Sequence, residues 1–192
     1  MTAALDDPAT VAAWIGDRLE ESGIAYAIGG ALALAVHGVP RMTTDADIAV
    51  YLDDRPVDEL YDSLDRAGCL FDRAEAARSL DRASLFSVRC GRILVDIFVS
   101  FHPLHDDARA RRVRLAGPDG AARWFLSAED LAVHKLALFR GKDLADLERL
   151  FAVKGPTLDV AYIRCWIERI APEPGDARHA TLADLERRFA GV

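Results

Sequence analysis

The fold is decided by the stretch Arg41-Met-Thr-Thr-Asp-Ala-Asp-Ile-Ala-Val-Tyr51, in which two carboxylates lead directly into a run with strand character. Side chains alternate across a strand, so Asp45 and Asp47 would project from the same face. Carboxylates about 5 to 7 Å apart repel each other by roughly a few kcal/mol at an effective dielectric constant of about 20. A fold that holds such a pair together usually supplies a cation, so the pair is interpreted as half of a metal site.

A third carboxylate, Asp96, lies inside the apolar run Ile93-Leu-Val-Asp-Ile-Phe-Val99. An ionisable group in such a run is costly to bury without a partner. On a strand, Asp96 would share a face with Leu94 and Phe98, while the odd-numbered residues from Val95 onward would face the core. The alternative is an Asp that forms a salt bridge or lies on an edge strand.

Length and composition indicate a globular protein. With 192 residues, of which 51% are hydrophobic, the chain can bury the core of one domain, or of one domain and a small appendage. No apolar run approaches the roughly 20 residues that a membrane-spanning helix needs. The start Met1-Thr-Ala-Ala-Leu-Asp-Asp7 lacks the basic and apolar regions of a signal peptide. We therefore expect a cytoplasmic protein with no membrane partner.

Cysteine usage and charge argue against two kinds of site. Cys69, Cys90 and Cys165 form no Cys-x-x-Cys pair and no metal-ligand spacing, so they are interpreted as buried thiols in a reducing compartment and zinc is not expected. The net charge of -7 argues against a broad nucleic-acid-binding surface. A local basic patch stays open, although a solvated face is favoured, because five arginines cluster: Arg109, Arg111, Arg112, Arg114 and Arg123.

The first half of the chain alternates helical and strand patterns. Apolar residues at helical spacing predict a helix over residues 8–22, with Asp7 as its N-cap. A buried strand over 24–28, the Gly29-Gly30 turn and a helix over 31–37 follow. The Asp-bearing strand would run to about residue 52, and a surface helix would start at Val57. Two further strands, over 84–88 and 92–100, would surround Cys90-Gly91.

Past about residue 102 the patterns become helical. An Arg-rich helix-like segment and a turn at 117–120 come first, and Ser127 is a predicted N-cap, with Asp130 three residues on, for a helix over 128–139. Further helices are predicted over 142–151, 158–170 and 180–190. We therefore predict a core over residues 1–115 and a helical region over residues 116–192 that closes over a nucleotide site.

The glycine turn and the carboxylates together suggest phosphate chemistry. A glycine turn between a strand and a helix leaves backbone amides free for a close ligand, and the positive end of the helix dipole suits phosphate. Three carboxylates on adjacent strands would fit a two-metal phosphoryl-transfer site, in which Asp45 and Asp47 hold the metals and Asp96 completes the site or acts as base.

This constellation resembles the polymerase-beta-type nucleotidyltransferase superfamily, whose pattern is a Gly-Gly or Gly-Ser turn, a helix, an Asp-x-Asp strand and a later strand Asp. The resemblance spans about residues 24–150. It implies an α/β (α+β) nucleotidyltransferase fold with a small mixed sheet flanked by helices, an NTP substrate, and Mg²⁺ or Mn²⁺. Gly38 is part of the matching pattern. The matching residues that would bind nucleotide or metal where the family does are Gly29, Gly30, Arg41, Thr44, Asp45, Asp47 and Asp96.

A narrower resemblance involves two motifs. Arg41-Met-Thr-Thr-Asp-Ala-Asp-Ile48 and the looser Arg140-Gly-Lys-Asp-Leu-Ala-Asp146 are similar to AbiEii-type nucleotidyltransferases, the toxins of bacterial type IV toxin-antitoxin pairs. This resemblance implies an antitoxin partner. It also implies an acceptor hydroxyl on RNA, particularly a tRNA 3′ end, or on a protein side chain.

Lys135 would rise from an apolar stripe of its helix, formed by Leu131, Leu138 and Phe139. By analogy with the family it would reach the nucleotide phosphates, as could Arg140 or Lys142, with Asp143 and Asp146 ordering these cations. The alternatives are a lysine that reaches past the stripe to solvent and an Asp143 that only stabilises the start of a helix.

Other catalytic signatures are weaker or missing. His37 and His134 are interpreted as surface or capping histidines, rather than ligand contacts. The sequence has no nucleophile elbow and no Cys-His signature, and Ala31-Leu-Ala after Gly29-Gly30 rules out a Walker A motif.

The prediction is therefore a Mg²⁺-dependent nucleotidyltransferase that moves a nucleoside monophosphate from an NTP to an acceptor hydroxyl. One alternative is a catalytically silent nucleotide- or partner-binding module, because the turn reads Gly-Gly-Ala where many active relatives have serine. A second is a small-molecule nucleotidyltransferase of the antibiotic-modifying type.

Overall fold

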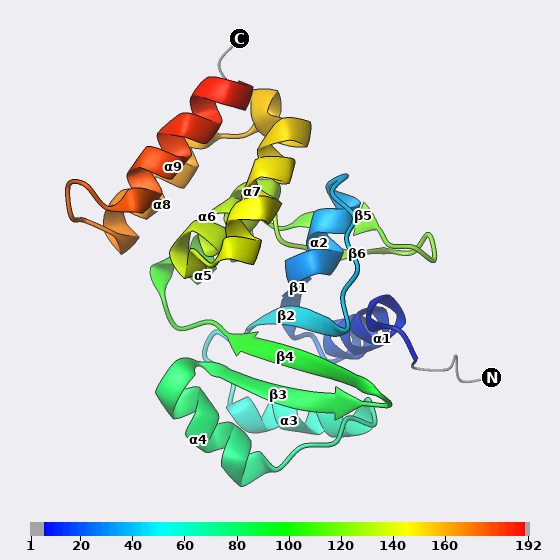
Figure 1. Cartoon of the computed structure of the whole chain (residues 1–192). Helices are drawn as coiled ribbons and strands as arrows, with labels where there is room; N and C mark the ends of the chain where they lie inside the picture. Colours follow the sequence, from blue (N-terminus) through cyan, green and yellow to red (C-terminus); the bar gives the residue numbers. More distant parts are fainter. Residues whose placement is uncertain (1–5, 191–192) are drawn as a thin grey trace.

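The computed structural model describes residues 6–190 and consists of one mixed sheet with helices packed on both faces (Figure 1). The strands are β1 (Ala25–Ile28), β2 (Asp45–Tyr51), β3 (Leu85–Cys90), β4 (Ile93–Val99), β5 (Val113–Ala116) and β6 (Ala122–Phe125). The helices are α1 (Pro8–Glu21), α2 (Gly30–Val36), α3 (Val57–Arg66), α4 (Arg73–Ala83), α5 (Pro103–Arg111), α6 (Ala128–Leu138), α7 (Gly141–Lys154), α8 (Val160–Ile170) and α9 (Ala177–Leu185). A 3₁₀ turn (Gly155–Thr157) follows α7, and a π-helical turn (Glu186–Ala190) follows α9.

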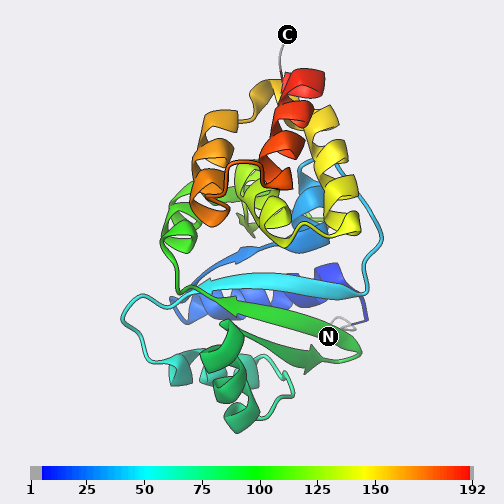
Figure 2. The same cartoon turned by 60° about the vertical axis from the view of Figure 1, so that its left-hand side comes forward.

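The six strands lie in the order β3-β4-β2-β1-β6-β5. β4 pairs in parallel with β2, and β6 pairs in parallel with β1, whereas the β1–β2, β3–β4 and β5–β6 pairs are antiparallel. The helices α6 to α9 gather on one side of the sheet (Figure 2). The predicted fold class is thereby confirmed: a small mixed sheet is flanked by helices and followed by a helical C-terminal part.

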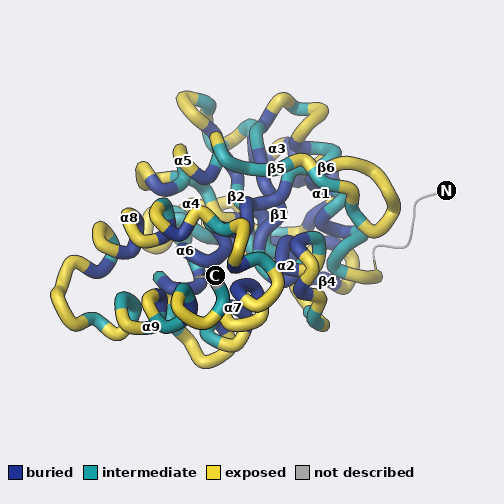
Figure 3. The backbone as a smooth tube through the Cα atoms, turned by 90° about the horizontal axis from the view of Figure 1, so that it is seen from above, coloured by how far each residue is buried: buried dark blue, intermediate teal, exposed yellow. Residues whose placement is uncertain are grey.

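The strands alternate between a buried face and an open face. Val95 and Ile97 are fully buried in the main core, whereas Leu94 and Phe98 on the other face are each 40% exposed. This confirms the side-chain alternation predicted for the run that contains Asp96. Figure 3 shows the buried stretches of β1 and β2 at the centre of the molecule.

The predicted helix starts and turns are largely confirmed, because capping is a local property of the sequence. Asp7 accepts a hydrogen bond from the Thr10 amide at the start of α1, and Ser127 accepts one from the Asp130 amide at the start of α6. Phe139 ends α6 in the left-handed conformation, and Gly141 opens α7.

Three elements were not predicted. The helix α4 has only one buried residue, Ala76, so it carries no apolar stripe. β5 and β6 form a hairpin around the turn at 117–120, and β6 joins the main sheet beside β1. The helical C-terminal part is confirmed from α6 onward, but the segments on both sides of the turn at 117–120 are strands and not helices. The hairpin spans residues on both sides of position 115, and the division into regions 1–115 and 116–192 stays a prediction.

The cysteine prediction is confirmed for the burial of Cys69 and Cys90, but it is wrong for their free thiols and for the burial of Cys165. Cys69 and Cys90 are joined by a disulfide whose Cα atoms are 4.5 Å apart, and Cys165 is an exposed free cysteine. Their wide separation in sequence concealed the pairing, which depends on Leu70 bridging to Arg89 beside the end of β3.

The arginine cluster is not a free basic surface. Arg123 is buried and forms salt bridges with Asp17 and Asp119, so a solvated position is wrong for this residue. The other four stack on aromatic rings or pair with carboxylates: Arg109, Arg111, Arg112 and Arg114. Among residues 6–190, no helix combines the length and apolar character needed to cross a bilayer.

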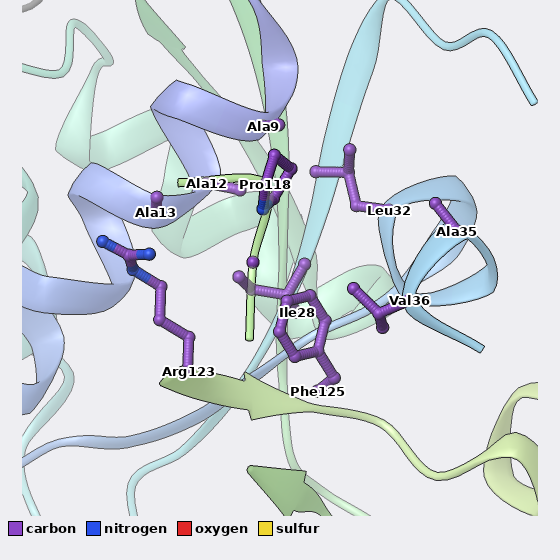
Figure 4. Close-up of a pocket in the computed structure, with 11 residues that line it drawn as sticks. Ala9, Ala12, Ala13, Ile28, Leu32, Ala35, Val36, Pro118, Arg123 and Phe125 are labelled. Atoms are coloured by element: carbon purple, nitrogen blue, oxygen red, sulfur yellow. The ribbon is translucent and has the colours of Figure 1, made fainter. Parts of the chain in front are cut away.

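A small cavity of about 50 Å³ lies between α1, α2 and the β5–β6 hairpin (Figure 4). Its lining is almost entirely apolar and includes Ala9, Leu32, Pro118 and Phe125. None of the carboxylates or cations predicted for catalysis lines it, so this cavity is separate from the predicted site.

Candidate active site

Three carboxylates meet on the open face of the sheet. Asp45 and Asp47 project from β2, and β2 pairs in parallel with β4 so that Asp47 lies directly opposite Asp96. Direct partners on adjacent strands have Cβ atoms about 5 Å apart. Asp45 is exposed, and Asp47 and Asp96 are partly buried. The strand register thus places the three acids at neighbouring positions on one face of the sheet.

Within this cluster, the surroundings of Asp47 disfavour the charged form of its carboxyl group. Burial, followed by repulsion from Asp45 and Asp96, raises the pKa of Asp47 to about 6. Lys135 and Lys142 act in the opposite direction and lower the same pKa. The cluster therefore has the excess of negative charge that a bound cation would relieve.

Two hydroxyl groups that orient these carboxylates were missed in the sequence. The Ser87 hydroxyl donates to Asp96 Oδ1 across 2.6 Å, from the position of β3 that pairs with Asp96. The Thr43 hydroxyl donates to the Asp45 carboxylate, whereas the predicted Thr44 is exposed and has no hydrogen bond of its own among the described residues. A signal in the sequence could have revealed the role of Ser87. A tight hairpin turn at Gly91 would pair the two strands so that Ser87 lies opposite Asp96.

The glycine turn touches the same cluster. The Gly29 amide donates to the Asp47 carbonyl across 2.8 Å, and this contact holds the turn against β2. Gly30 has a φ of 54°, and a Cβ atom there would lie 1.8 Å from Asp47 Oδ2. Gly30 is therefore needed both for its backbone conformation and for the space that the Asp47 carboxylate occupies.

The three carboxylates fit a divalent cation by their chemistry. Carboxylate oxygen is the ligand that Mg²⁺ prefers, and the raised pKa of Asp47 marks the charge that such an ion would offset. Within residues 6–190, no three His, Cys, Asp or Glu side chains lie in an arrangement that already forms a metal-binding group. Asp45, Asp47 and Asp96 are the residues that could hold the ion.

A buried network of charges lies on the helical side of the site. The Lys135 ammonium is 2.7 Å from Asp146 and 3.3 Å from Asp143, and all three side chains are at least 90% buried. Arg41 Nε lies 3.2 Å from Asp146, and Arg140 Nε lies 2.6 Å from Asp143. Three cations thus surround two carboxylates, and the network has a net positive charge.

The predictions for this second group have mixed outcomes. Lys135 does not reach past its apolar stripe to solvent, so that alternative is wrong. Asp143 combines both of its predicted roles, because it accepts from the Arg140 amide in the first turn of α7 and also pairs with the two cations. Burial opposes its ionisation, but Arg140 and Lys135 outweigh burial and hold the pKa of Asp143 below its ordinary value. Lys142 is exposed.

We expect Lys135→Met to lower the free energy of unfolding by about 2 to 4 kcal/mol, because it leaves two buried carboxylates with one cation fewer. Adding Asp146→Asn should recover at least half of this loss, since it removes one of the orphaned charges. Urea unfolding at pH 7 measures both effects. Lys142→Met is the matched control on the exposed side of α7, and an equal loss there would contradict the assignment.

The two histidines lie outside this group. His37 ends α2, as predicted for a capping residue, and its Nε2–H donates to the Leu126 carbonyl across 2.8 Å. His134 is half-buried: burial lowers its pKa to about 4, and its Nε2 has no partner among the described residues.

One solved structure is similar enough to this chain to show its fold. The antibiotic-resistance factor ANT(2'')-Ia in its solution structure has a TM-score of 0.59 at 14% identity, with 94% of this chain and 97% of that chain covered. Its complex with adenylyl-2"-tobramycin matches with a TM-score of 0.49 at 17% identity, covering 95% and 98%. An antigenic nucleotidyltransferase-like protein from Paracoccidioides brasiliensis matches with 0.49 at 16% identity, covering 94% of each chain. The likeness to the solution structure, at 14% identity, concerns the fold alone.

Sequence comparison identifies the family. No curated protein matches the chain. Residues 11–164 match the family described as nucleotidyltransferase of unknown function (DUF6036), and this range contains all three carboxylates, the glycine turn and the buried charge network. Because the match covers most of the chain, this protein is a nucleotidyltransferase and belongs to that family.

Proposed function

We propose that this protein transfers a nucleoside monophosphate from an NTP to an acceptor hydroxyl in a Mg²⁺-dependent reaction. The observation that carries the proposal is the direct pairing of Asp47 with Asp96 on parallel strands, beside a glycine turn that leaves room for the Asp47 carboxylate. Asp45 and Asp47 would hold the metal ion, and Asp96 would complete its ligands or act as base. Bound there, Mg²⁺ would neutralise phosphate charge and favour ionisation of the attacking hydroxyl.

Residues of the chain itself would carry out and orient the proton transfer. Asp96 accepts the proton of the acceptor hydroxyl, whose oxygen forms a bond to the α-phosphorus of the NTP as pyrophosphate leaves. Ser87 occupies one carboxylate oxygen of Asp96 and holds the other toward the reacting hydroxyl.

The helical side supplies cations for the phosphates. The Lys135 ammonium is already shared by Asp143 and Asp146, which suits a role in ordering α6 against α7. Lys142 and Arg140 are better placed for direct phosphate contact, because both are exposed and both interact electrostatically with Asp47. Arg41 joins the loop before β2 to this network through Asp146, and the Gly29-Gly30 turn and Thr44 complete the proposed nucleotide contacts.

Several finer assignments stay predictions from the sequence. They are the AbiEii-like subtype, a toxin role with an antitoxin partner, an acceptor on RNA or protein, and a cytoplasmic location.

The test uses each α-labelled NTP with Mg²⁺, total RNA and a protein pool as acceptors. Wild-type protein should transfer label, and Asp96→Asn should reduce transfer by roughly 100-fold or more, because it removes the base. NTP binding measured by calorimetry should change by less than about threefold in this variant. Asp81→Asn, an exposed acid on α4, is the control and should behave as wild type.

Two results would count against the proposal: undiminished transfer by Asp96→Asn, or no Mg²⁺-dependent NTP binding by the wild type. NTP binding without transfer to any acceptor would favour the catalytically silent module instead.

A further inference from the structure

The open face of β3 and β4 carries an exposed mixture of apolar, hydroxyl and cationic groups beside Asp96. Cross-strand pairing places Ser87 next to Asp96, Arg89 next to Leu94, and Leu85 next to Phe98. These six residues, here called the β3–β4 face, form three successive pairs along the two strands. β3 is the edge strand of the sheet, so no further strand of residues 6–190 covers this side.

The β3–β4 face is accessible to solvent, and its one cationic group has no ion-pair partner among the described residues. Leu94 and Phe98 are each 40% exposed, which is unusual for large apolar side chains on a sheet whose other face is fully buried. Ser87 and Arg89 are exposed as well. Among the described residues, no carboxylate lies within salt-bridge distance of the Arg89 guanidinium, whereas most arginines of this chain are paired.

The order of these groups along β4 and β3 indicates the chemistry of a ligand that would match them. Asp96 lies between Phe98 on one side and the Leu94–Arg89 pair on the other. Residues two apart on a strand are separated by roughly 6.5 to 7 Å, and adjacent strands by about 4.8 Å. A molecule whose hydroxyl meets Asp96 would therefore place one flank on the Phe98 ring and the opposite flank within reach of the long Arg89 side chain.

We propose that the β3–β4 face binds the acceptor, and that the acceptor is an anionic molecule with a flat apolar group, the chemistry of a nucleotide. The flat group stacks on Phe98, the phosphate pairs with Arg89, and the hydroxyl between them lies at Asp96. This inference rests on the proposed function. In the transfer step the hydroxyl proton passes to Asp96, the hydroxyl oxygen bonds to the α-phosphorus, and pyrophosphate leaves.

The charges of the site argue against a polycationic acceptor. Of the acids at this face, Asp45 and Asp47 would hold the metal ion, and Asp96 would accept the proton of the acceptor hydroxyl. On the helical side, Asp143 and Asp146 are already neutralised by Lys135, Arg41 and Arg140. A polycation would find no unengaged carboxylate in either group and would meet Arg89, whereas an anion would be attracted.

The test is a binding titration on the full chain with saturating Mg²⁺ and a non-hydrolysable NTP analogue, repeated without the analogue. The probes are a ribonucleotide pentamer, a nucleoside 5′-monophosphate and the polycation tobramycin. The pentamer and the mononucleotide separate an oligonucleotide end from a free nucleotide as the source of the same chemistry. We expect one or both to bind, and we expect tobramycin to bind at least tenfold more weakly.

Variants assign the contacts. Arg89→Gln and Phe98→Ala should each weaken binding of the preferred probe by roughly tenfold, through the lost ion pair and the lost stacking surface. Arg149→Gln, an exposed arginine on α7, is the control and should leave binding unchanged. The inference is overturned if neither nucleotide probe binds, if tobramycin binds more tightly, or if both variants bind as wild type. Binding of the NTP analogue itself reports on the proposed function separately, because Arg89 and Phe98 lie outside the metal-binding carboxylates.

Discussion

Replacing Asp47 with Asn should abolish Mg²⁺-dependent NTP binding and reduce nucleotidyl transfer on the order of 1000-fold, equivalent to about 4 kcal/mol of transition-state stabilisation. Asp47 is the middle of the three carboxylates, with Asp45 on the same strand and Asp96 directly opposite. No neighbouring acid can replace Asp47. The Gly29 amide donates to the Asp47 carbonyl, and the missing side chain of Gly30 leaves room for the Asp47 carboxylate.

The same substitution should make the metal-free protein more stable at neutral pH. The pKa of Asp47 rises from 3.8 to about 6 on folding, so the native state binds its proton more tightly than the unfolded state does. The contribution of this group to stability is therefore greatest below about pH 4 and is lost as the pH rises through 6. Because the side chain keeps some solvent contact, we expect a penalty of roughly 1 to 2 kcal/mol at pH 7.

Urea unfolding in EDTA at pH 4, 5, 6 and 7 tests this linkage. The difference between Asp47→Asn and wild type cancels the contributions of acids that do not interact with Asp47, and it should grow in favour of the variant as the pH rises. Parallel pH profiles would show that Asp47 titrates normally and that the three carboxylates do not repel one another. Asp81→Asn serves again as the exposed control.

Replacing Gly30 with Ala should impair transfer nearly as much as Asp47→Asn, by roughly 100-fold or more. The added Cβ would lie 1.8 Å from Asp47 Oδ2 and 2.7 Å from its Cγ, so the carboxylate would have to leave its position. Alanine is also disfavoured at a φ of 54°. We expect the free energy of unfolding to fall by about 1 to 3 kcal/mol through these two effects.

Gly29→Ala is the matched control in the same turn. Its φ is -113°, and its nearest contact would be Leu126 Cδ1 at 3.4 Å, an ordinary van der Waals distance. Transfer and stability should therefore change little. If Gly29→Ala and Gly30→Ala were equally active, the close approach of Gly30 to Asp47 would not matter for the reaction. Labelled transfer and urea unfolding on both variants give the comparison.

The individual residues of the candidate site could be predicted from the sequence, but the contacts between distant residues could not. The shared face of Asp45 and Asp47 follows from strand alternation, and so does the position of Asp96 between the exposed Leu94 and Phe98. The caps at Asp7 and Ser127 follow from side chains that bond amides three residues away. Each of these depends on neighbours within one turn or one strand.

Other features escaped prediction because their determinants are distant or weak. The helix α4 buries only Ala76, and β5 and β6 have four residues each, so neither carries a long apolar pattern. The disulfide between Cys69 and Cys90 depends on a β-bridge outside the main strands. The contact of Ser87 with Asp96 depends on the closure of a hairpin.

The residues that could carry the chemistry were predictable from the sequence, because side-chain type and strand or helix periodicity are local properties. Which of these residues are neighbours follows from the tertiary structure. It paired Asp47 with Asp96, placed Gly30 against the Asp47 carboxylate, and brought Arg41 to Asp146 across 105 positions of sequence. Such contacts arise from the register of strands that are not consecutive in the sequence and from the packing of helices against the sheet. No single segment carries a pattern that predicts this register or packing.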